Sequence, residues 1–383
     1  MPEQRITLSI SSLLLILLAI PLLILLWQLR SLLLILMISV VLASSIEPVV
    51  NWAENYRVPR WLAVVLVYLT LIGVLIGAGL IVGPAIFEQI ERLIRQIPVS
   101  LKSMFNLAEN WVMGLSATRP ELVDQLFHQV LDVQALTRWV IRSSQQLLVR
   151  SYGVTTGIVG GVFSLILAIF LSGYMLADSR TLIKNLVRLL PQPWDDRLAA
   201  QIAPMSDRIG SYIRGRVLVS AILGVVITVS LSQLGLSDFA LGLGAIAGVT
   251  NLIPFLGPIL GAIPALVVAI SQGGWAFLWV LLLYVIIQNL ETYLLDPLLV
   301  GSSVGVHPLY QLLAVLGGAQ VLGIIGALIV PPWIAGGAVL LENLYLRPKL
   351  MAERRQKTAS PPLTGHPGSH GLESPADSTP AGG

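Results

Sequence analysis

The stretch NLIPFLGPILGAIP (residues 251–264) places three prolines and two glycines inside a run that is otherwise apolar. Each proline lacks a backbone amide donor and glycine permits tight turns, so we expect a helix through this stretch to be broken. In hydrocarbon, a broken backbone is stable only where protein buries it or where it borders a polar cavity. If the chain crosses a membrane, this stretch should therefore line such a cavity.

The composition indicates a membrane protein. Of the 383 residues, 55% are apolar and only 11% are charged, and the mean hydropathy is +0.84. Such a chain has too few charged residues to cover a water-soluble fold. The net charge of +3 comes from Lys and Arg residues between apolar runs, which fits membrane topology better than nucleic-acid binding. No Cys is present, which excludes disulfides and thiolate metal sites.

The apolar runs predict an all-α, polytopic integral membrane protein with about eight transmembrane helices, some of them broken by Pro and Gly. Three helices are expected in residues 1–83 and a fourth in residues 153–177. Residues 217–346 are expected to form a C-terminal transmembrane core that contains the broken helices.

Three further segments are too polar to cross a bilayer. In residues 84–152 apolar side chains recur three or four apart, which predicts a small extramembrane insertion of amphipathic helices. Residues 178–216 predict a basic amphipathic segment on the cytoplasmic membrane surface, and residues 347–383 a disordered cytoplasmic tail. The basic residues of the last two segments place both termini in the cytoplasm and the insertion outside.

A second Pro/Gly-interrupted apolar segment, LGGAQVLGIIGALIVPPW, covers residues 316–333 and begins with Gly317 and Gly318. In transporters, two broken helices that meet near the midplane present free backbone groups to a solute. The sequence therefore suggests a gated polar site between the two broken segments. The alternative is that both segments are Pro-kinked or re-entrant helices with a structural role.

Polar side chains in the apolar run of residues 275–295 form the other informative group. Gln288 and Glu291 fall on one helical face. A carboxylate at mid-bilayer costs about 2.5–3.5 kcal/mol, so Glu291 is either an ion or proton carrier or a glutamate that lies at the interface or bonds a neighbouring helix. Asn251 either caps a broken helix or contacts a solute.

Together these observations predict a substrate pathway and no catalytic centre. The sequence contains no phosphate loop, H-E-x-x-H or G-x-S-x-G motif, and we expect no enzyme activity, cofactor or metal site. The candidate pathway residues are Asn251, Pro254, Gly257, Pro258, Gly261, Pro264, Gln288, Glu291, Gly317 and Gly318.

Three motifs in the C-terminal half resemble the autoinducer-2 exporter family, the PerM-type permeases. They are the I-P-x-x-G-P signature at residues 253–258, the Q-x-x-E-x-x-x-x-x-P stretch at residues 288–297, and His307-Pro308-Leu309 followed by a Gly-rich helix. One departure is VPPW at residues 330–333, where the family has a single proline.

The resemblance implies a transport protein of about eight spans in the bacterial cytoplasmic membrane. Some relatives are linked to export of the quorum-sensing signal autoinducer-2 and others to sodium/proton exchange. We therefore expect a secondary exporter or facilitator of a small polar solute, with a sodium/proton antiporter and a non-transporting membrane scaffold as alternatives. The expected partners are the lipid bilayer and a small polar solute or ion, and small-residue-rich spans make a homo-oligomer plausible.

Overall fold

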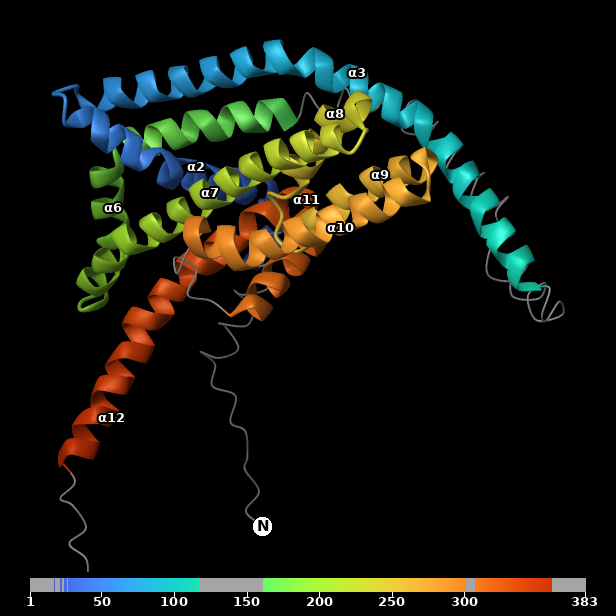
Figure 1. Ribbon diagram of the computed structural model, residues 1–383. Coiled ribbons are helices and arrows are strands. Elements are labelled where there is room, and N and C mark those ends of the chain that lie inside the picture. The colour runs from blue at the N-terminus through green and yellow to red at the C-terminus, as the bar shows by residue number, and fades with distance from the viewer. Residues whose placement is uncertain are drawn as a thin grey trace, which may run out of the picture. The chain divides into compact units, whose positions relative to one another are not determined.

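The computed structural model of the chain describes residues 17, 21, 22, 24, 25, 27–116, 161–300 and 307–359. This part of the chain is helical and contains no strand (Figure 1). The predicted all-α fold with broken helices is therefore confirmed.

The number of membrane-crossing helices was predicted less well. Within the described ranges, the helical segments that are long and apolar enough to cross a bilayer are Arg30–Glu54, Arg60–Gln96, Trp194–Gln233, Gly274–Val300 and Pro308–Arg355. A sixth span results if the helix Gly161–Ala177 is counted together with α6 (Ser179–Val187), at 82° to it. The predicted count of eight is not confirmed, and the predicted first span lies largely outside the described residues.

Helices α2 (Arg30–Glu54) and α3 (Arg60–Ser116) form the N-terminal part of the described fold. The turn between them is held by Arg60, whose Nε donates to the carbonyl oxygen of Leu176 (2.9 Å) and whose guanidinium pairs with Glu54 (3.0 Å). Arg60 thereby fixes the start of α3 to the end of the helix Gly161–Ala177.

The course of α3 differs from the expectation that a new segment begins at residue 84. The helix continues through Pro84 and Pro98 as far as Ser116. A proline inside a membrane helix bends it more often than it ends it, and α3 curves along its length in Figure 1. Whether the second half of α3 lies outside the membrane stays a prediction, and residues 117–160 of the expected insertion lie outside the described residues.

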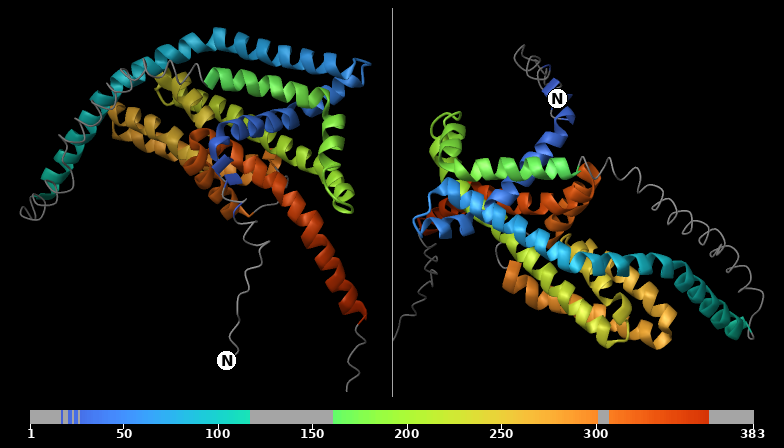
Figure 2. Two further views of the ribbon diagram at one scale, coloured as in Figure 1. Left: turned by 180° about the vertical axis from the view of Figure 1, so that it is seen from behind. Right: turned by 90° about the horizontal axis from the view of Figure 1, so that it is seen from above.

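Helix α7 (Trp194–Gln233) is the centre of the described fold. Its 40 residues join the second half of the expected surface segment, residues 178–216, to the beginning of the expected C-terminal transmembrane core without a break. It contacts α2, α8 (Ser237–Thr250), α11 (Pro308–Leu340) and the π-helix η1 (Glu291–Val300). Figures 1 and 2 show it between the blue N-terminal helices and the yellow and orange C-terminal ones.

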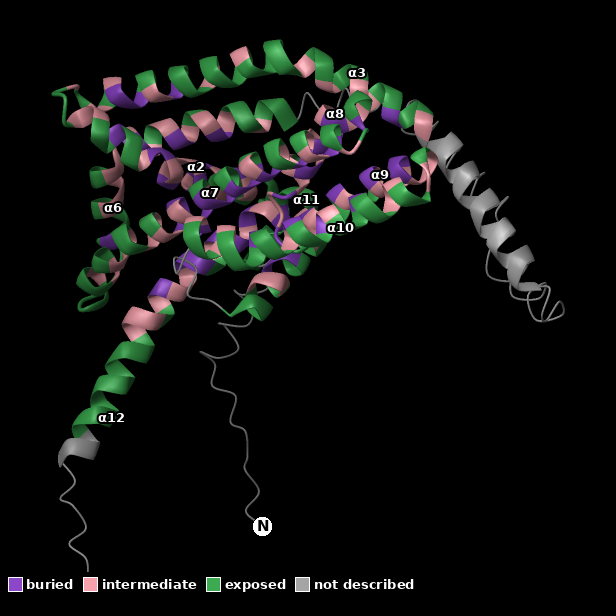
Figure 3. Cartoon of the chain, in the orientation of Figure 1, coloured by how far each residue is buried: buried purple, intermediate pink, exposed green. Residues whose placement is uncertain are grey.

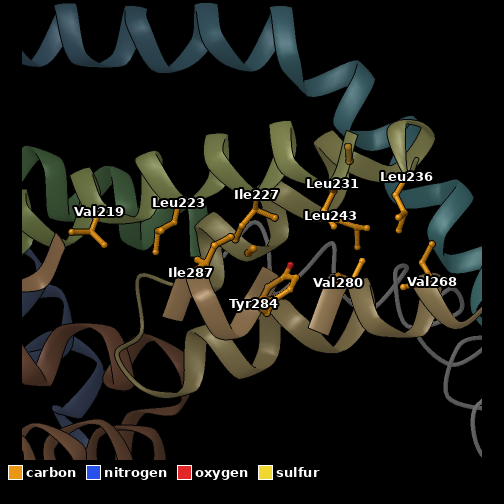
Figure 4. Packing of buried hydrophobic residues seen from close by; sticks show 14 of the residues in the cluster. Val219, Leu223, Ile227, Leu231, Leu236, Leu243, Val268, Val280, Tyr284 and Ile287 are labelled. Atoms are coloured by element: carbon orange, nitrogen blue, oxygen red, sulfur yellow. The ribbon is translucent and has the colours of Figure 1, made fainter. Parts of the chain in front are cut away.

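The main hydrophobic core lies where α7 and α8 pack against the two helices that follow α8. These are α9 (Leu256–Gln272) and α10 (Gly274–Leu290), joined at Gly273, whose φ of 124° only glycine adopts readily. In Figure 4, Leu223 and Ile227 of α7 point toward Tyr284 and Ile287 of α10. Side chains from both helices therefore fill the space beside the C-terminal end of α8.

Large apolar side chains also cover the outside of the helices. Leu80, Ile81 and Phe87 on α3 are 73%, 81% and 75% exposed, and green, exposed positions follow the outer helices in Figure 3. In water such a surface would aggregate, whereas in a bilayer it faces acyl chains.

Helix α11 contains the second broken segment. Gly323 has φ 69° and ψ −158°, which divides α11 into two arms. A Cβ atom on Gly318 would lie 2.7 Å from the carbonyl carbon of Gly326. In a continuous helix these two residues would be about 12 Å apart along the axis, so the chain folds back at Gly323.

The C-terminal residues form a separate unit that begins at Leu341. It contains η3 (Leu341–Leu346) and α12 (Arg347–Ala359). The expected disorder of residues 347–383 is therefore wrong for the first 13 of them. Arg, Lys, Glu, Gln, Leu and Ala are strong helix formers, and Lys349 pairs with Glu353 one turn on (4.0 Å). Residues 360–383 lie outside the described residues.

Candidate functional site

The stretch of residues 251–264 forms the tip of a helical hairpin. Helix α8 ends at Thr250 and α9 begins at Leu256. Between them Phe255 has φ 64°, and the amide of Gly257 donates to the carbonyl oxygen of Ile253 (2.9 Å). Glycine is required at 257, because a Cβ atom there would lie 2.6 Å from the Cα of Asn251. The break expected from the prolines and glycines is present.

Small residues also let the two arms of the hairpin lie in direct contact. A Cβ atom on Gly261 of α9 would lie 2.9 Å from the Cα of Ala247 on α8. The 14 residues of α8 and the 17 residues of α9 are about 21 Å and 26 Å long, against a hydrocarbon layer of about 30 Å. Each arm is therefore too short to cross this layer by itself.

A buried polar cluster lies at this tip. Nδ2 of Asn251 donates to Oε1 of Glu291 (3.1 Å), and Nη1 of Arg216 lies 3.0 Å from the same oxygen. The side chains of Arg216 and Glu291 are 5% and 3% exposed, and Asn251 is also buried. An ionised carboxylate inside an apolar region must be compensated, and here a guanidinium and an amide do so.

A second carboxylate shares the same guanidinium. Nη1 of Arg216 lies 3.3 Å from Oδ1 of Asp296, whose side chain is 40% exposed. Glu291 and Asp296 both belong to η1, in which hydrogen bonds join residues five apart. This winding brings positions 291 and 296 onto one face, whereas an α-helix would turn them apart. Two carboxylates therefore meet one guanidinium.

A small cavity adjoins the cluster. It has a volume of about 20 Å³ and is lined by polar side chains of Asn251, Tyr284, Gln288 and Glu291 together with Pro258 and apolar residues of α7. A space of this size holds a single water molecule. Passage of a larger solute would require the hairpin and α10 to move apart.

Tyr284 ties α10 to the hairpin. Its hydroxyl donates to the carbonyl oxygen of Gly261 (3.2 Å), and its ring is part of the core beside α7 (Figure 4). Gln288, one turn further along α10, donates to the hydroxyl of Thr292 (3.3 Å). Polar contacts therefore follow one face of α10 from the hairpin to the beginning of η1.

The structure brings most of the predicted pathway residues together. Asn251, Pro258, Gln288 and Glu291 line the cavity. Pro254, Gly257 and Gly261 shape the hairpin tip, and Pro264 lies half-buried further along α9. That these residues form a substrate pathway stays a prediction.

The two glycines of the second broken segment have a different position. They lie in α11, which packs against α7 and α2, and they do not line the cavity. Gly318 is buried where the arms of α11 meet, whereas Gly317 is exposed with open space around it. Within the described part of the chain, the first of the two broken segments contributes residues to the polar site and the second does not.

Sequence reasoning missed Arg216. It was assigned to the basic surface of residues 178–216, but it is buried and paired with two carboxylates of η1. The reason is that α7 runs on into the core, so its last arginine lies beyond the surface part of the helix. The signal available was Glu291 itself, because a carboxylate in an apolar run needs a cationic partner.

The comparison with protein families identifies the family of this chain. Residues 14–352 match the model described as "AI-2E family transporter". The chain belongs to this family. The resemblance expected from the three motifs is thereby confirmed, and the chain is a multi-pass membrane protein of a transporter family.

Three curated relatives of this AI-2E family member cover most of its length. "Putative transport protein YrrI" of Bacillus subtilis (strain 168) is 31% identical over 327 residues, 82% of this chain and 86% of its own. "Putative permease PerM" of Escherichia coli (strain K12) is 28% identical, over 73% of this chain and 78% of its own. "AI-2 transport protein TqsA" of the same strain is 25% identical, over 79% and 83%.

Proposed function

We propose that this protein is a secondary exporter or facilitator that passes a small polar solute through the tip of the α8–α9 hairpin. The observation that carries the proposal is the buried group of Arg216, Asn251 and Glu291 beside a cavity at the broken backbone. The name of the relative TqsA supports autoinducer-2 as the first solute to test.

The backbone of the tip supports this assignment. Residues 251–255 are not helical, and three prolines in or near the tip lack amide donors. Backbone groups freed in this way at membrane depth need protein or water as partners, and transporters use such breaks to contact solutes. The carboxylate and amide at the cavity add an acceptor and a donor for a polar molecule.

A larger space elsewhere on the protein fits a polar solute less well. A groove of about 430 Å³ runs between α7 and α8. Its lining is made of small and aliphatic residues such as Val225, Leu241 and Val249, with hydroxyls from Ser220 and Thr228 and no charged side chain. Such a groove suits acyl chains, so the smaller polar cavity is the better solute site.

A metabolite comparison tests the proposal without assuming the cargo. Cells that lack the protein, cells with the wild-type protein and cells with Asn251→Ala would be compared for metabolites inside and outside. We expect at least one polar compound to move with the wild-type protein and to stay in place with Asn251→Ala at equal protein level. Identical profiles in all three strains would contradict a transport role under those conditions.

A second function, sodium/proton exchange, is favoured by one observation. Glu291 and Asp296 provide two carboxylates for one guanidinium, which leaves one negative charge available for a cation. In proteoliposomes, this function predicts sodium-driven proton movement with the wild-type protein and none with Glu291→Gln. Equal proton movement with both would rule out Glu291 as the ion site.

The basic residues outside the spans support a bacterial cytoplasmic-membrane location with both termini inside. Reporter fusions at each terminus test this orientation, because a periplasm-active phosphatase fused there should stay inactive. An active fusion at either end would reverse the assignment for that end.

A further inference from the structure

The groove between α7 and α8 is lined by other residues than the cavity at Glu291. It follows residues 217–229 of α7 and residues 241–252 at and beyond the end of α8, with a volume of about 430 Å³. The helices carry glycine and alanine where they touch, and a Cβ atom on Gly244 would lie 2.7 Å from the carbonyl oxygen of Gly224. The groove therefore exists because no large side chain fills the space beside this contact.

The groove opens to the outer surface of the helices. Val225 on one side of it and Val249 on the other are 64% and 68% exposed, which matches Val74 on the outer helix α3 at 62%. None of the residues that line the groove carries a charge. In a bilayer such an opening faces lipid rather than water.

The dimensions of the groove fit one hydrocarbon chain and not a helix of a second copy. Residues 217–229 of α7 span about 18 Å, close to the roughly 15 Å of hydrocarbon in one leaflet. The volume divided by this length gives a mean cross-section of about 24 Å². A helix with its side chains is about 10 Å wide, which corresponds to roughly 80 Å².

A buried hydroxyl in the groove lacks a partner. Ser220 lines the groove and is only 4% exposed, yet its Oγ has no hydrogen-bond partner among the described residues. The matched case is Thr228, which lines the same groove and whose hydroxyl donates to the carbonyl oxygen of Gly224 (2.8 Å). Since buried polar groups nearly always have a partner, an occupant of the groove should bring an acceptor to Ser220.

An exposed guanidinium lies beyond one end of the groove. Arg214 precedes Val217 and Ala221 of the lining by three and seven residues, so it lies on the same stripe of α7. Its Nη1 donates to the carbonyl oxygens of Ser44 and Ser45 (3.2 Å each), so donors on Nε and Nη2 remain for an anion. Positions 214 and 220 are about 9 Å apart along the helix.

We propose that the groove binds one phospholipid of the leaflet on the side of Arg214. One acyl chain lies between α7 and α8, its ester carbonyl oxygen accepts a hydrogen bond from Ser220, and the phosphate pairs with Arg214. The chain reaches Leu252 at the hairpin tip, so the lipid supports one arm of the hairpin. The proposal does not depend on what the protein transports.

Photo-crosslinking of the unmodified protein tests the bound lipid. The protein would be placed in vesicles of phosphatidylethanolamine and phosphatidylglycerol, with a small fraction of phosphatidylglycerol that carries a diazirine on one acyl chain. Mass spectrometry of peptides then counts the adducts at each residue. Val225 and Val249 should carry at least threefold more adducts than Val74, although all three are similarly exposed. Equal yields would show ordinary lipid contact only and would overturn the proposal.

Two matched variants test the groove itself. Ala221→Trp fills it, whereas Ala78→Trp makes the same change at an exposed alanine on α3. Adducts at Val225 should fall to the level of Val74 in Ala221→Trp and stay high in Ala78→Trp. Equal adducts at Val225 in both folded variants would contradict the proposal. Should Ala221→Trp fail to fold, the comparison within the unmodified protein decides.

The head-group contact is tested by varying the fraction of the photoreactive lipid. Arg214→Gln should raise the fraction that half-saturates the adducts at Val225 at least threefold, and the control Arg180→Gln on α6 should not change it. Equal half-saturation would remove the phosphate from the site. A second copy over the groove would give fewer adducts at Val225 than at Val74 and a dimer in native mass spectrometry that Ala221→Trp dissociates, which would overturn the proposal.

Discussion

Arg216 in the middle of α7 and Glu291 at the first position of η1 form a buried ion pair, with Nη1 3.0 Å from Oε1. The two residues are 75 positions apart in the sequence, and both lie in apolar surroundings. The pair joins the central helix to the end of α10, next to the hairpin tip. It therefore contributes both to stability and to the polarity of the candidate site.

Breaking this pair should be costly. Glu291→Gln leaves Arg216 with only the partly exposed Asp296, and removal of one partner of a buried pair typically costs about 3–5 kcal/mol. The double variant Arg216→Met/Glu291→Gln should lose much less stability than the sum of the losses in Arg216→Met and Glu291→Gln, because it leaves no buried charge unpaired. Unfolding in mixed detergent and denaturant measures all four proteins. Additive losses would show that the two groups do not interact.

The two glycines Gly257 and Gly317 provide a matched comparison. A Cβ atom on Gly257 would overlap the end of α8, whereas nothing lies within 4 Å of one on Gly317. Gly257→Ala should therefore open the hairpin tip and destabilise the protein by more than about 1 kcal/mol, as overpacking of a close contact does. Gly317→Ala should be neutral or stabilising by up to about 1 kcal/mol, because alanine favours helix. Melting temperatures in detergent distinguish the two.

Substitutions of Phe255 test the positive φ of the backbone at the hairpin tip. It is one of two described non-glycine residues with positive φ, at 64°, and its side chain is 42% exposed. Phe255→Gly should be more stable than Phe255→Ala by about 1 kcal/mol, since only glycine adopts this conformation without strain. Both variants lose the same ring, so their difference isolates the backbone. A more stable Phe255→Ala would mean that the tip is not left-handed at this position.

A substitution of Tyr284 tests the hydrogen bond that joins α10 to the hairpin. Tyr284→Phe removes the hydrogen bond to the carbonyl oxygen of Gly261 and retains the packed ring. The expected loss of stability is about 1 kcal/mol, the usual contribution of one neutral hydrogen bond. Tyr293, which is 78% exposed, provides the control, and Tyr293→Phe should change stability by less. Equal changes in stability for both variants would show that the hydrogen bond from Tyr284 to Gly261 does not stabilise the contact between α10 and the hairpin.

The fold was largely predictable because its strongest determinant is local. Apolar runs of span length predict helices, and prolines with glycines at residues 251–264 predict the break that the structure contains. Composition changes were less reliable guides to boundaries. The sequence becomes more polar after Pro84 and becomes apolar after Arg216. Helices α3 and α7 nevertheless continue through these two positions, because a helix needs only its backbone hydrogen bonds to continue.

The site was predictable only in part because its partners are distant in sequence. Asn251 and Glu291 stood out as polar residues in apolar runs, but the sequence alone did not show that they bond to each other. Arg216 was one of several basic residues in its segment, and nothing local distinguished it. The π-helical winding of η1, which turns Asp296 toward the same guanidinium, had no recognised sequence signal either.

The most direct test of the central claim is solute flux in proteoliposomes with three proteins: wild type, Asn251→Ala and Gly317→Ala. The solute would be the compound found in the metabolite comparison, or autoinducer-2. If the hairpin tip is the pathway, Asn251→Ala should reduce flux at least tenfold while remaining folded, and Gly317→Ala should transport like the wild type. Unchanged flux through folded Asn251→Ala would contradict the account.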